Sequence, residues 1–340
     1  MDSSLLALIL VLALAFVNGT NDVSKAIATL VGSGITNYRT AIAWGTVWTM
    51  IGAGAAAFVA AAMVKTFSNG LIESGMAIPP ALALAVLIGA IGWVLFASRT
   101  GLPVSTTHAL TGAIVGAGLV AFGGHGLIWS TLIGKIALPL LLSPLLALSF
   151  SVLLHPVIRT VAARWEGTCL CVMPTARALV TVNAQGMTRT LIQTSAFGQP
   201  VMAVPAQCDR AGLSGFTIGL DSIHWLSSGL ASLARGTNDA PKIVAIVLLG
   251  GMTTAWTSST AQAIAFTGVA LAMGLGSYLG GLRVTEVLAE KVTRMDHMEG
   301  LSANLTTSSL VLVSATMGLP VSTTHVSSSA IIGIGLLKGL

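Results

Sequence analysis

Residues 18–25 read Asn-Gly-Thr-Asn-Asp-Val-Ser-Lys, and residues 235–242 read Arg-Gly-Thr-Asn-Asp-Ala-Pro-Lys. A second stretch, Gly-Leu-Pro-Val-Ser-Thr-Thr-His at 101–108, recurs without a change at 318–325. The offset is 217 residues in both cases, from 18 to 235 and from 101 to 318. Two long motifs at one fixed spacing indicate that the chain contains two copies of one structural unit.

The composition of the 340-residue chain is that of a membrane protein. Hydrophobic residues make up 54% of it and charged residues only 8%, and the mean hydropathy is +0.89. Soluble domains carry about 25% charged residues, so lipid rather than water must cover most of this surface. The formal net charge of +5 comes from scattered Lys and Arg residues without a basic run, which argues against nucleic-acid binding.

Apolar runs predict the helices. The run at 5–17 has only 13 residues, too few to cross about 30 Å of hydrocarbon, and it resumes after 18–22. We therefore expect a helix broken in mid-membrane, where Gly19 lets the backbone unwind, and a second one broken at Gly236. The expected elements are a broken helix at 5–34 and helices at 41–64, 80–98, 104–122 and 129–155 in the first copy, then a broken helix at 221–251 and helices at 257–281, 299–316 and 321–337 in the second.

These elements divide the chain into a first membrane repeat at 1–155, a polar linker at 156–218 and a second membrane repeat at 219–340. Five spans separate equivalent points of the repeats if the paired segments cross the membrane, and three do if the pairs are re-entrant hairpins. Both counts are odd, so the repeats must have opposite orientations. We predict an all-α polytopic membrane fold of two inverted-topology repeats with broken helices, a recurring plan of secondary transporters.

The linker is expected to lie in the cytoplasm. Its five arginines outweigh the acidic Glu166 and Asp209, and positively charged loops stay inside. Cys169, Cys171 and Cys208 fit no common zinc spacing, so we expect reduced thiols. The second repeat stops where the counterpart of helix 129–155 would begin, so it is expected to lack that helix, whether or not the chain is truncated at Leu340. The five arginines of the linker are Arg159, Arg164, Arg177, Arg189 and Arg210.

Charged residues inside apolar runs are the first sign of function. A carboxylate at membrane depth costs roughly 3 kcal/mol, so it rarely lacks a role. Each copy places Asn-Asp there, followed three residues later by a lysine on the same helical face that can neutralise the carboxylate. The residues expected to line an ion and substrate site are Asn21, Asp22, Lys25, Asn238, Asp239 and Lys242.

The repeated Pro-Val-Ser-Thr-Thr segment is typical of a helix start, because Pro suits the first turn and Ser or Thr suits the N-cap. A helix N-terminus offers unpaired N–H groups and a partial positive charge, which together favour oxyanions. Hydroxyl groups add hydrogen-bond donors to this anion site without adding charge. The anion is therefore bound less tightly than by full charges and can be released again. His108 and His325, which follow, either titrate near neutral pH or only hydrogen-bond locally. The expected anion ligands are Ser105, Thr106, Thr107, Ser322, Thr323 and Thr324, with Asp22 and Asp239 beside them.

The duplicated Gly-Thr-Asn-Asp and Gly-Leu-Pro-Val-Ser-Thr-Thr-His motifs resemble the signatures of the inorganic phosphate transporter family, which includes low-affinity phosphate permeases and sodium–phosphate symporters. The match covers about 1–125 and 219–340 and excludes the linker. The resemblance implies import of inorganic phosphate, coupled to Na⁺ or H⁺, by a multi-pass homodimer in the lipid of the plasma membrane, which in bacteria is the inner membrane. It also implies that the Asn-Asp pairs line the ion and substrate site and that the Ser-Thr-Thr segments hold phosphate.

One departure from the family bears on the coupling ion. Family members commonly have Asn where this chain has Lys25 and Lys242. An ammonium group would occupy the space and charge of a sodium ion, so we expect proton coupling, or lysines that act as tethered cations. His108 and His325 are further candidates for ion coupling. No cofactor or metal is expected.

Three alternatives to a phosphate symporter stay open on the sequence alone. Sulfate is also tetrahedral, but near neutral pH it carries no proton with which to give a hydrogen bond to Asp22 or Asp239. This distinction disappears if the lysines cancel those carboxylates. A channel could use the symmetric polar helix ends as a filter. An enzyme would need an activated nucleophile with an orienting partner. The duplicated hydroxyls supply no such pair, so we predict a transporter and not an enzyme.

Overall fold

The computed structural model describes residues 3–73, 76, 78–163, 167–173, 176–182, 188–194, 199–204, 219–249, 259–290 and 295–338, and most of them are helical. The first repeat contains α1 (Ser3–Asp22), α2 (Ser24–Gly32), α3 (Tyr38–Val59), α4 (Ala61–Asn69), α5 (Pro80–Thr100), α6 (Thr106–Phe122), the 3-10 turn η1 (Gly124–Gly126), α7 (Trp129–Thr131), the π-helical turn η2 (Leu132–Ala137) and α8 (Leu138–Ala162). The second repeat contains α10 (Leu220–Leu248), α11 (Ser259–Gly280), α12 (Leu282–Glu290), α13 (His297–Thr316) and α14 (Thr323–Leu336).

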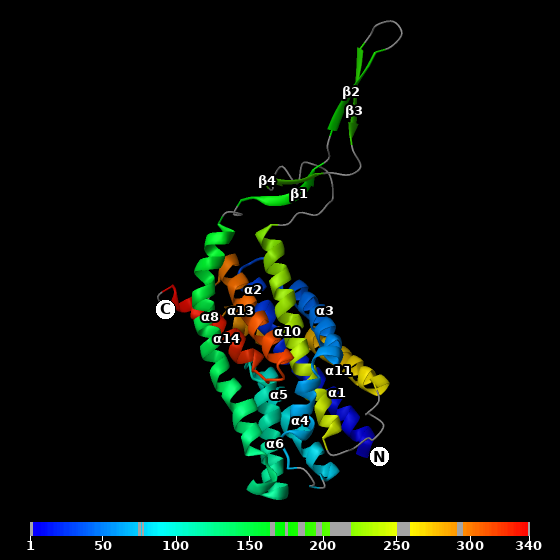
Figure 1. Cartoon of the computed structure of the whole chain (residues 1–340), viewed down its shortest axis with the longest axis vertical. Helices are drawn as coiled ribbons and strands as arrows, with labels where there is room; N and C mark the ends of the chain where they lie inside the picture. The colour runs from blue at the N-terminus through cyan, green and yellow to red at the C-terminus, as the bar shows by residue number, and fades with distance from the viewer. Residues whose placement is uncertain are drawn as a thin grey trace.

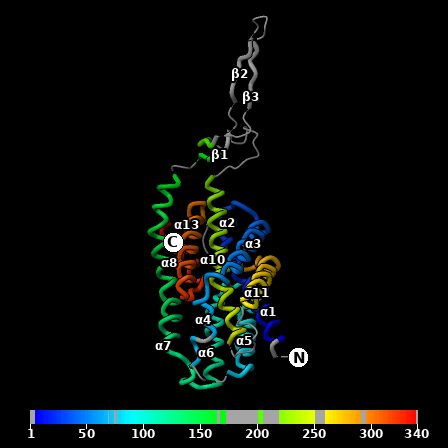
Figure 2. Tube along the Cα trace, turned by 45° about the vertical axis from the view of Figure 1, so that its right-hand side comes forward, coloured from blue at the N-terminus to red at the C-terminus, as the bar shows by residue number. Residues whose placement is uncertain are grey.

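The helices form one elongated bundle with the linker at one end (Figure 1). The hairpin of α13 and α14 lies in the half of the bundle next to the linker, and the hairpin of α5 and α6 lies in the opposite half, in both views (Figures 1 and 2). The N-terminus of α1 lies toward the end away from the linker (Figure 1). Equivalent hairpins of the two repeats therefore occupy opposite halves of the molecule.

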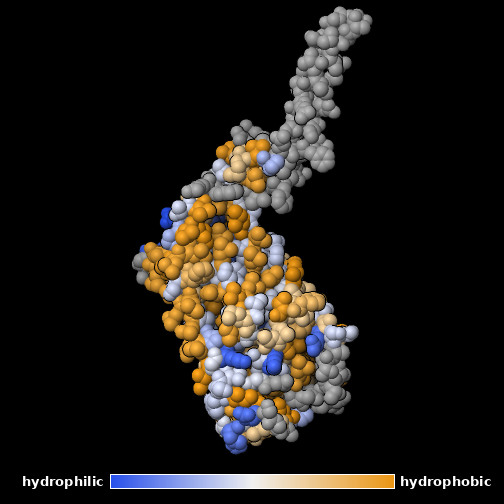
Figure 3. All heavy atoms as spheres, in the orientation of Figure 1, coloured by the Kyte–Doolittle hydropathy of each residue, from blue (hydrophilic) through white to orange (hydrophobic). Residues whose placement is uncertain are grey.

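The surface of the bundle suits lipid. Five helical stretches in the described residues are long and apolar enough to cross a membrane: Leu5–Gly32, Tyr38–Val59, Pro80–Thr100, Trp129–Ala162 and Ser259–Gly280. Large apolar side chains lie exposed along α8, among them Leu141, Leu145 and Leu153. Apolar residues likewise cover much of the visible face of the bundle (Figure 3). Exposed apolar surface of this extent is stable in lipid and not in water, so the chain is a multi-pass membrane protein.

The predicted helices of the membrane repeats are confirmed, except for the breaks described below. Their ends differ from the prediction by a few residues, and the predicted helix at 41–64 is divided at Ala60 into α3 and α4. The short helices α4 and α12 were not predicted as separate elements. α8 continues to Ala162, beyond the expected end at 155.

The two helices that carry the Asn-Asp motifs each pack against a helix of the other repeat. α1 lies along α11, and α10 lies along α3. A β-carbon on Gly19 would overlap the backbone near Ser277, and one on Gly236 would overlap the backbone near Thr49. Only glycine allows these helices to approach so closely. The two repeats are therefore interlocked through two equivalent contacts.

The prediction of broken helices is wrong for the second repeat and only partly right for the first. α10 runs without interruption from Leu220 to Leu248, with Pro241 inside the helix. α1 and α2 are separated by Val23 alone, whose N–H still lies 3.4 Å from the Gly19 carbonyl oxygen. The glycines allow close helix packing and do not unwind the helices. The apolar runs on either side of each motif therefore belong to one nearly continuous helix.

Gly236→Ala is expected to destabilise the protein by roughly 1–3 kcal/mol, because the added methyl group forces α10 away from α3. Gly19→Ala should act similarly on the contact of α1 with α11. The free energy of unfolding of the purified protein in detergent measures the effect. Gly92→Ala is the matched control, since a β-carbon at this position in α5 meets no atom within 4 Å. Equal stability of Gly236→Ala and the control would contradict the packing role.

The linker contains strands, which the sequence did not predict. β1 (Cys169–Met173) pairs antiparallel with β4 (Gln199–Ala203), and β2 (Ala176–Val182) pairs antiparallel with β3 (Thr188–Thr194). The Cys169 thiol donates to the Ala203 carbonyl oxygen at 3.4 Å, whereas Cys171 is disulfide-bonded. The expectation of reduced thiols is therefore wrong for Cys171, and Cys208 lies outside the described residues.

Candidate functional site

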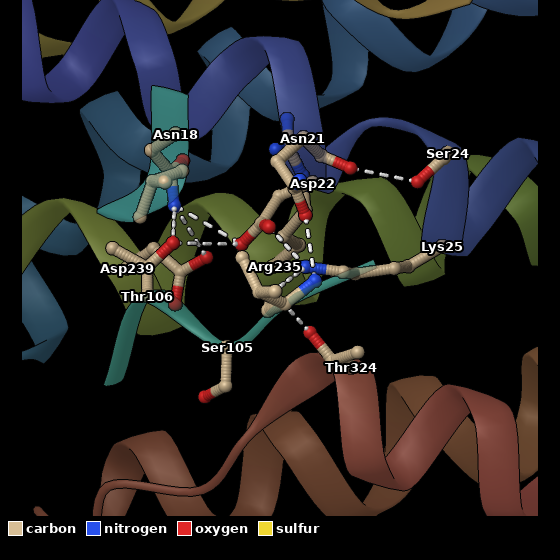
Figure 4. A network of polar contacts seen from close by, with 12 residues as sticks. Asn18, Asn21, Asp22, Ser24, Lys25, Ser105, Thr106, Arg235, Asp239 and Thr324 are labelled. Atoms are coloured by element: carbon tan, nitrogen blue, oxygen red, sulfur yellow. Dashed lines mark hydrogen bonds and ion pairs between the residues drawn. The ribbon is translucent and has the colours of Figure 1, made fainter. Parts of the chain in front are cut away.

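Asp22 and Asp239 meet in the middle of the bundle, although 217 residues separate them in the sequence. Asp22 ends α1, Asp239 lies within α10, and both are buried. The side-chain amide nitrogen of Asn18 donates to Asp22 Oδ2 at 3.0 Å and to Asp239 Oδ2 at 3.3 Å (Figure 4). One amide group therefore bridges the carboxylates of both repeats, and its hydrogen bonds offset part of their mutual repulsion.

Each carboxylate has a buried lysine as its ion-pair partner. Lys25 pairs with Asp22, and Lys242 Nζ lies 3.3 Å from Asp239 Oδ1. Each ammonium also donates to the backbone carbonyl that precedes the Ser-Thr-Thr segment of its own repeat, at 2.8 Å in the first and 3.3 Å in the second. The structure thus contains the same arrangement twice, at positions related by the 217-residue offset.

The tips of the two hairpins contact each other, also twice. Thr107 Oγ1 in α6 donates to the Val321 carbonyl oxygen at 3.1 Å, and Thr324 Oγ1 in α14 donates to the Val104 carbonyl oxygen at 2.7 Å. Lys242 Nζ donates to Thr107 Oγ1 at 2.7 Å, so the second ion pair reaches the first tip. The hairpins come from opposite halves of the bundle (Figure 1), and these hydrogen bonds bring the hydroxyl groups of both repeats to one place.

Ser105 and Ser322 are the N-caps of α6 and α14, as the sequence predicted. Their hydroxyl oxygens accept from the backbone N–H groups of His108 and His325, at 3.2 and 3.1 Å. The N–H groups of the two threonines that follow each serine have no intrahelical acceptor, as at any helix start. Both helix N-termini therefore retain donors that an anion could use.

The remaining predicted residues lie at the same place. Thr106 Oγ1 accepts from Asn18 at 2.9 Å, and Thr323 is buried in the first turn of α14. The rings of His108 and His325 are tilted against each other, with centroids 4.8 Å apart. The structure therefore brings the histidines of the two repeats together between the hairpins.

The side chain of Asn21 binds the backbone of the first hairpin tip. Its side-chain nitrogen donates to the Leu102 carbonyl oxygen at 2.9 Å, and its side-chain oxygen accepts from the Val104 N–H at 3.1 Å. Asn238 donates to Asp239 Oδ1 at 2.9 Å and to the Val321 carbonyl oxygen at 3.2 Å. Both asparagines thus connect a long helix to the hairpin of the same repeat.

Arg235 is a site residue that sequence reasoning missed. Its side chain is 2% exposed and lies beside Asp22 and Lys25 (Figure 4). Nη2 donates to Thr49 Oγ1 at 2.5 Å and lies 3.4 Å from Ser277 Oγ, whereas Nε and Nη1 are buried without a hydrogen-bond partner. The signal that could have found it is the repeat itself, because position 235 corresponds to Asn18 and places a cation directly before the Gly-Thr-Asn-Asp that both copies share.

The buried cluster has an excess of positive charge. Three cations, Arg235, Lys25 and Lys242, face two carboxylates, Asp22 and Asp239, which gives a net charge of +1 with every group ionised. A net charge inside the membrane is costly unless a counter-ion neutralises it. The cluster is therefore suited to a singly charged anion.

A cavity of about 260 Å³ lies between α4, the turn η2 and the second hairpin tip. It ends at Gly318 and neighbouring tip residues. Its walls carry Lys65 on α4 and Lys135 on the π-helical turn η2. Two exposed ammonium groups that line a cavity raise the local concentration of anions.

Comparisons with known proteins agree on one family. The sequence matches the profile described as "Phosphate transporter family" over residues 18–339. A "Probable low-affinity inorganic phosphate transporter" of Mycobacterium leprae is 30% identical over 98% of this chain and 70% of its own length. A protein of the same name from Mycobacterium tuberculosis (strain ATCC 25618 / H37Rv) is 31% identical over 98% of this chain and 69% of its own length.

One solved structure is also similar. It is described as "The sodium-dependent phosphate transporter" and superposes with a TM-score of 0.76, covering 100% of this chain and 90% of that chain. At 22% sequence identity, this likeness shows a shared fold.

Proposed function

Because the chain belongs to the phosphate transporter family, we propose that it imports inorganic phosphate by proton-coupled symport, with the two hairpin tips exposing one site alternately to either side. The protein is a membrane transporter and not an enzyme, and in bacteria it belongs to the plasma membrane. The coupling ion, the alternating exposure, the inverted relation of the repeats and the ligands of the substrate are parts of the proposal.

The observation that carries the proposal is the convergence of hydroxyl groups from both repeats beside a cluster of net charge +1. Thr107 and Thr324 each donate to the opposite tip, so separation of the tips would free both hydroxyls for the oxygens of a tetrahedral anion. A singly charged phosphate would neutralise the cluster. The proposed ligands are Ser105, Thr106, Thr107, Ser322, Thr323 and Thr324, with Asp22 and Asp239 accepting hydrogen bonds from the hydroxyl groups of phosphate.

The lysines support coupling to protons rather than to sodium. Lys25 Nζ is held by a carboxylate and a backbone carbonyl, and Lys242 Nζ by a carboxylate, a carbonyl and a threonine hydroxyl. Oxygen ligands of these kinds are the ones that hard metal cations prefer. We infer that the two ammonium groups occupy positions where a free cation would otherwise bind, so they act as tethered cations.

Orientation and assembly are further parts of the proposal. The arginine excess supports a cytoplasmic linker, so phosphate would arrive from the opposite side, past Lys65 and Lys135. The disulfide at Cys171 is the opposing observation, since disulfides persist in oxidising compartments. The family resemblance supports a homodimer.

Sulfate is the second candidate substrate, and the pairing of both carboxylates with lysines favours it. Near neutral pH phosphate carries a hydroxyl group that can give a hydrogen bond to a free carboxylate, whereas sulfate carries none. Each carboxylate is already paired with a lysine, which weakens that discrimination. Transport in the presence of both anions must therefore distinguish them.

The test is uptake of radiolabelled phosphate by proteoliposomes that contain the full chain. A pH gradient and a sodium gradient are imposed separately, each with and without excess unlabelled sulfate. We expect uptake that follows the pH gradient, saturates with phosphate and is unaffected by sulfate, because the lysines take the place of sodium. Uptake that requires sodium would keep phosphate as the substrate and overturn proton coupling. Loss of uptake with sulfate, or no uptake with either gradient, would overturn the substrate.

A further inference from the structure

Buried polar side chains are concentrated in the half of the bundle next to the linker. They lie on α2, on the first half of α10 and on α13, and none of them is more than 5% exposed. Burial of a hydroxyl, amide or imidazole group in a membrane protein costs free energy unless partners compensate it. The residues are Thr29, His224, Ser227, Ser228, Ser232, Ser302, Asn304, Thr306, Thr307 and Ser308.

The other repeat has apolar residues at the equivalent positions. Subtraction or addition of 217 takes seven of these ten positions to residues of the main hydrophobic core or packed against it, and the other three to Ala7, Ala85 and Gly89. The polarity is therefore a property of one half of the molecule and not of the repeated unit. The free-energy cost of burying these polar groups has no counterpart in the other half of the molecule. This asymmetry points to a function at the linker end. Four equivalent pairs are Thr29 and Ile246, His224 and Ala7, Ser227 and Leu10, and Asn304 and Leu87.

These side chains connect the charged cluster to the linker end. Thr29 follows Lys25 by one helical turn of α2, on the same face. Thr29 Oγ1 donates to Asn304 Oδ1 at 3.1 Å, and Asn304 Nδ2 donates to Ser227 Oγ at 3.4 Å. Ser227 lies one turn of α10 from His224.

His224 is a buried titratable group in this polar half, as are Glu299 on α13 and His155 on α8. His224 is 0% exposed, and neither ring nitrogen has a hydrogen-bond partner. A β-carbon on Gly300 would overlap the imidazole ring and would lie 3.2 Å from Thr29 Cβ, so the ring fills a space next to Thr29 that only a glycine on α13 leaves open. On its other side, the ring centroid of His297 lies 6.4 Å away.

The outer end of the polar half is charged and open to solvent. His297 Nδ1 lies 2.8 Å from Asp221 Oδ1, and both side chains are exposed. The charged or titratable groups that face His224 are His297 and Asp296 at the start of α13 and Asp221 on its own helix, with Lys25 further inward on α2. A buried imidazole thus stands between an exposed ion pair and the buried cluster.

We propose that His224 carries protons between the exposed His297–Asp221 pair and the buried Lys25–Asp22 pair, by way of Thr29. The inference rests on the proposed proton coupling and names its route. One ring nitrogen accepts a proton from the inner side, the other releases its own proton toward His297, and the ring returns to neutral, so no net proton is consumed. No hydrogen bond joins Lys25 to Thr29, Thr29 to His224 or His224 to His297, so each of these three steps requires a bridging water molecule.

The test uses the full chain in proteoliposomes, with phosphate and a pH-sensitive dye inside the vesicles. His224→Ala introduces the residue that already stands at the equivalent position of the other repeat, and His224→Gln keeps more of the volume. His155→Ala is the matched control, because His155 is also buried, on α8, but its Nδ1 lies 3.1 Å from Ser302 Oγ. Three rates are measured: uptake driven by the pH gradient, proton movement with phosphate, and exchange of internal for external phosphate at equal pH.

Both His224 variants are expected to lose about 10-fold or more in gradient-driven uptake and proton movement, while exchange changes less than about 2-fold. His155→Ala should stay near wild type in all three rates. Uptake by the His224 variants at the control level would overturn the role of His224, and so would an equal fall of exchange and uptake. A wild-type protein that moves phosphate without protons would overturn proton coupling itself, together with this route.

Discussion

Asp239→Asn is expected to reduce phosphate uptake by about 100-fold or more, which is the largest effect we predict for a single substitution. The change leaves Lys242 buried without its ion-pair partner and raises the net charge of the cluster from +1 to +2. Removal of one partner of a buried pair costs roughly 3–5 kcal/mol. It also removes a carboxylate proposed to accept a hydrogen bond from phosphate. Initial uptake rates in proteoliposomes measure the loss.

A double variant separates stability from transport. Asp239→Asn with Lys242→Met removes both members of the pair, so the free energy of unfolding should recover at least in part relative to Asp239→Asn alone. Uptake should not recover, because the carboxylate is still missing. Glu73→Gln, which changes an exposed loop carboxylate, is the control and should transport normally. Recovery of uptake in the double variant would show that Asp239 only balances the lysine, which contradicts its place in the substrate site.

Replacement of both Lys25 and Lys242 by asparagine is expected to make transport dependent on sodium. The change takes the net charge of the buried cluster from +1 to −1 and vacates two positions lined by carboxylate and carbonyl oxygens. A free cation must then enter with the anion. Uptake without sodium should fall about 10-fold or more and should rise with sodium concentration to a plateau.

The matched control changes the same number of lysines outside the cluster. Lys65 and Lys135 are exposed and line the cavity, so their replacement by asparagine is expected to alter the affinity for phosphate without creating a need for sodium. If the Lys25/Lys242 variant transports at the wild-type rate in the absence of sodium, the lysines are not tethered cations. If it loses uptake and sodium has no effect at any concentration, that interpretation fails as well.

The duplicated motifs predicted which residues would meet, but not how they would meet. Asp22 and Asp239, like Thr107 and Thr324, lie together because the two repeats cross near one point. The prediction of unwound helices failed because glycine has two uses that look identical in a sequence. Gly19 and Gly236 allow a neighbouring helix to approach, and that neighbour belongs to the other repeat.

Arg235 and His224 show where reading the chain fell short. Both lie on α10, and each has a different residue at the equivalent position of the other repeat. The serines and threonines near His224 were equally inconspicuous, because such hydroxyls often bond to the carbonyl of the preceding turn in membrane helices. Comparison of the two repeats position by position would have found all of them.

The sequence by itself determined that this protein is duplicated, that lipid surrounds it, that two carboxylates and two Ser-Thr-Thr segments lie in its membrane repeats, and that it resembles phosphate transporters. These properties depend on composition and on spacing along the chain. Only the tertiary structure decided that one asparagine bridges both carboxylates, that three cations outnumber them, and that one half of the bundle is polar where the other is apolar. Those properties come from contacts between residues about 80 to 300 positions apart. Local periodicity, in contrast, relates residues only about four positions apart.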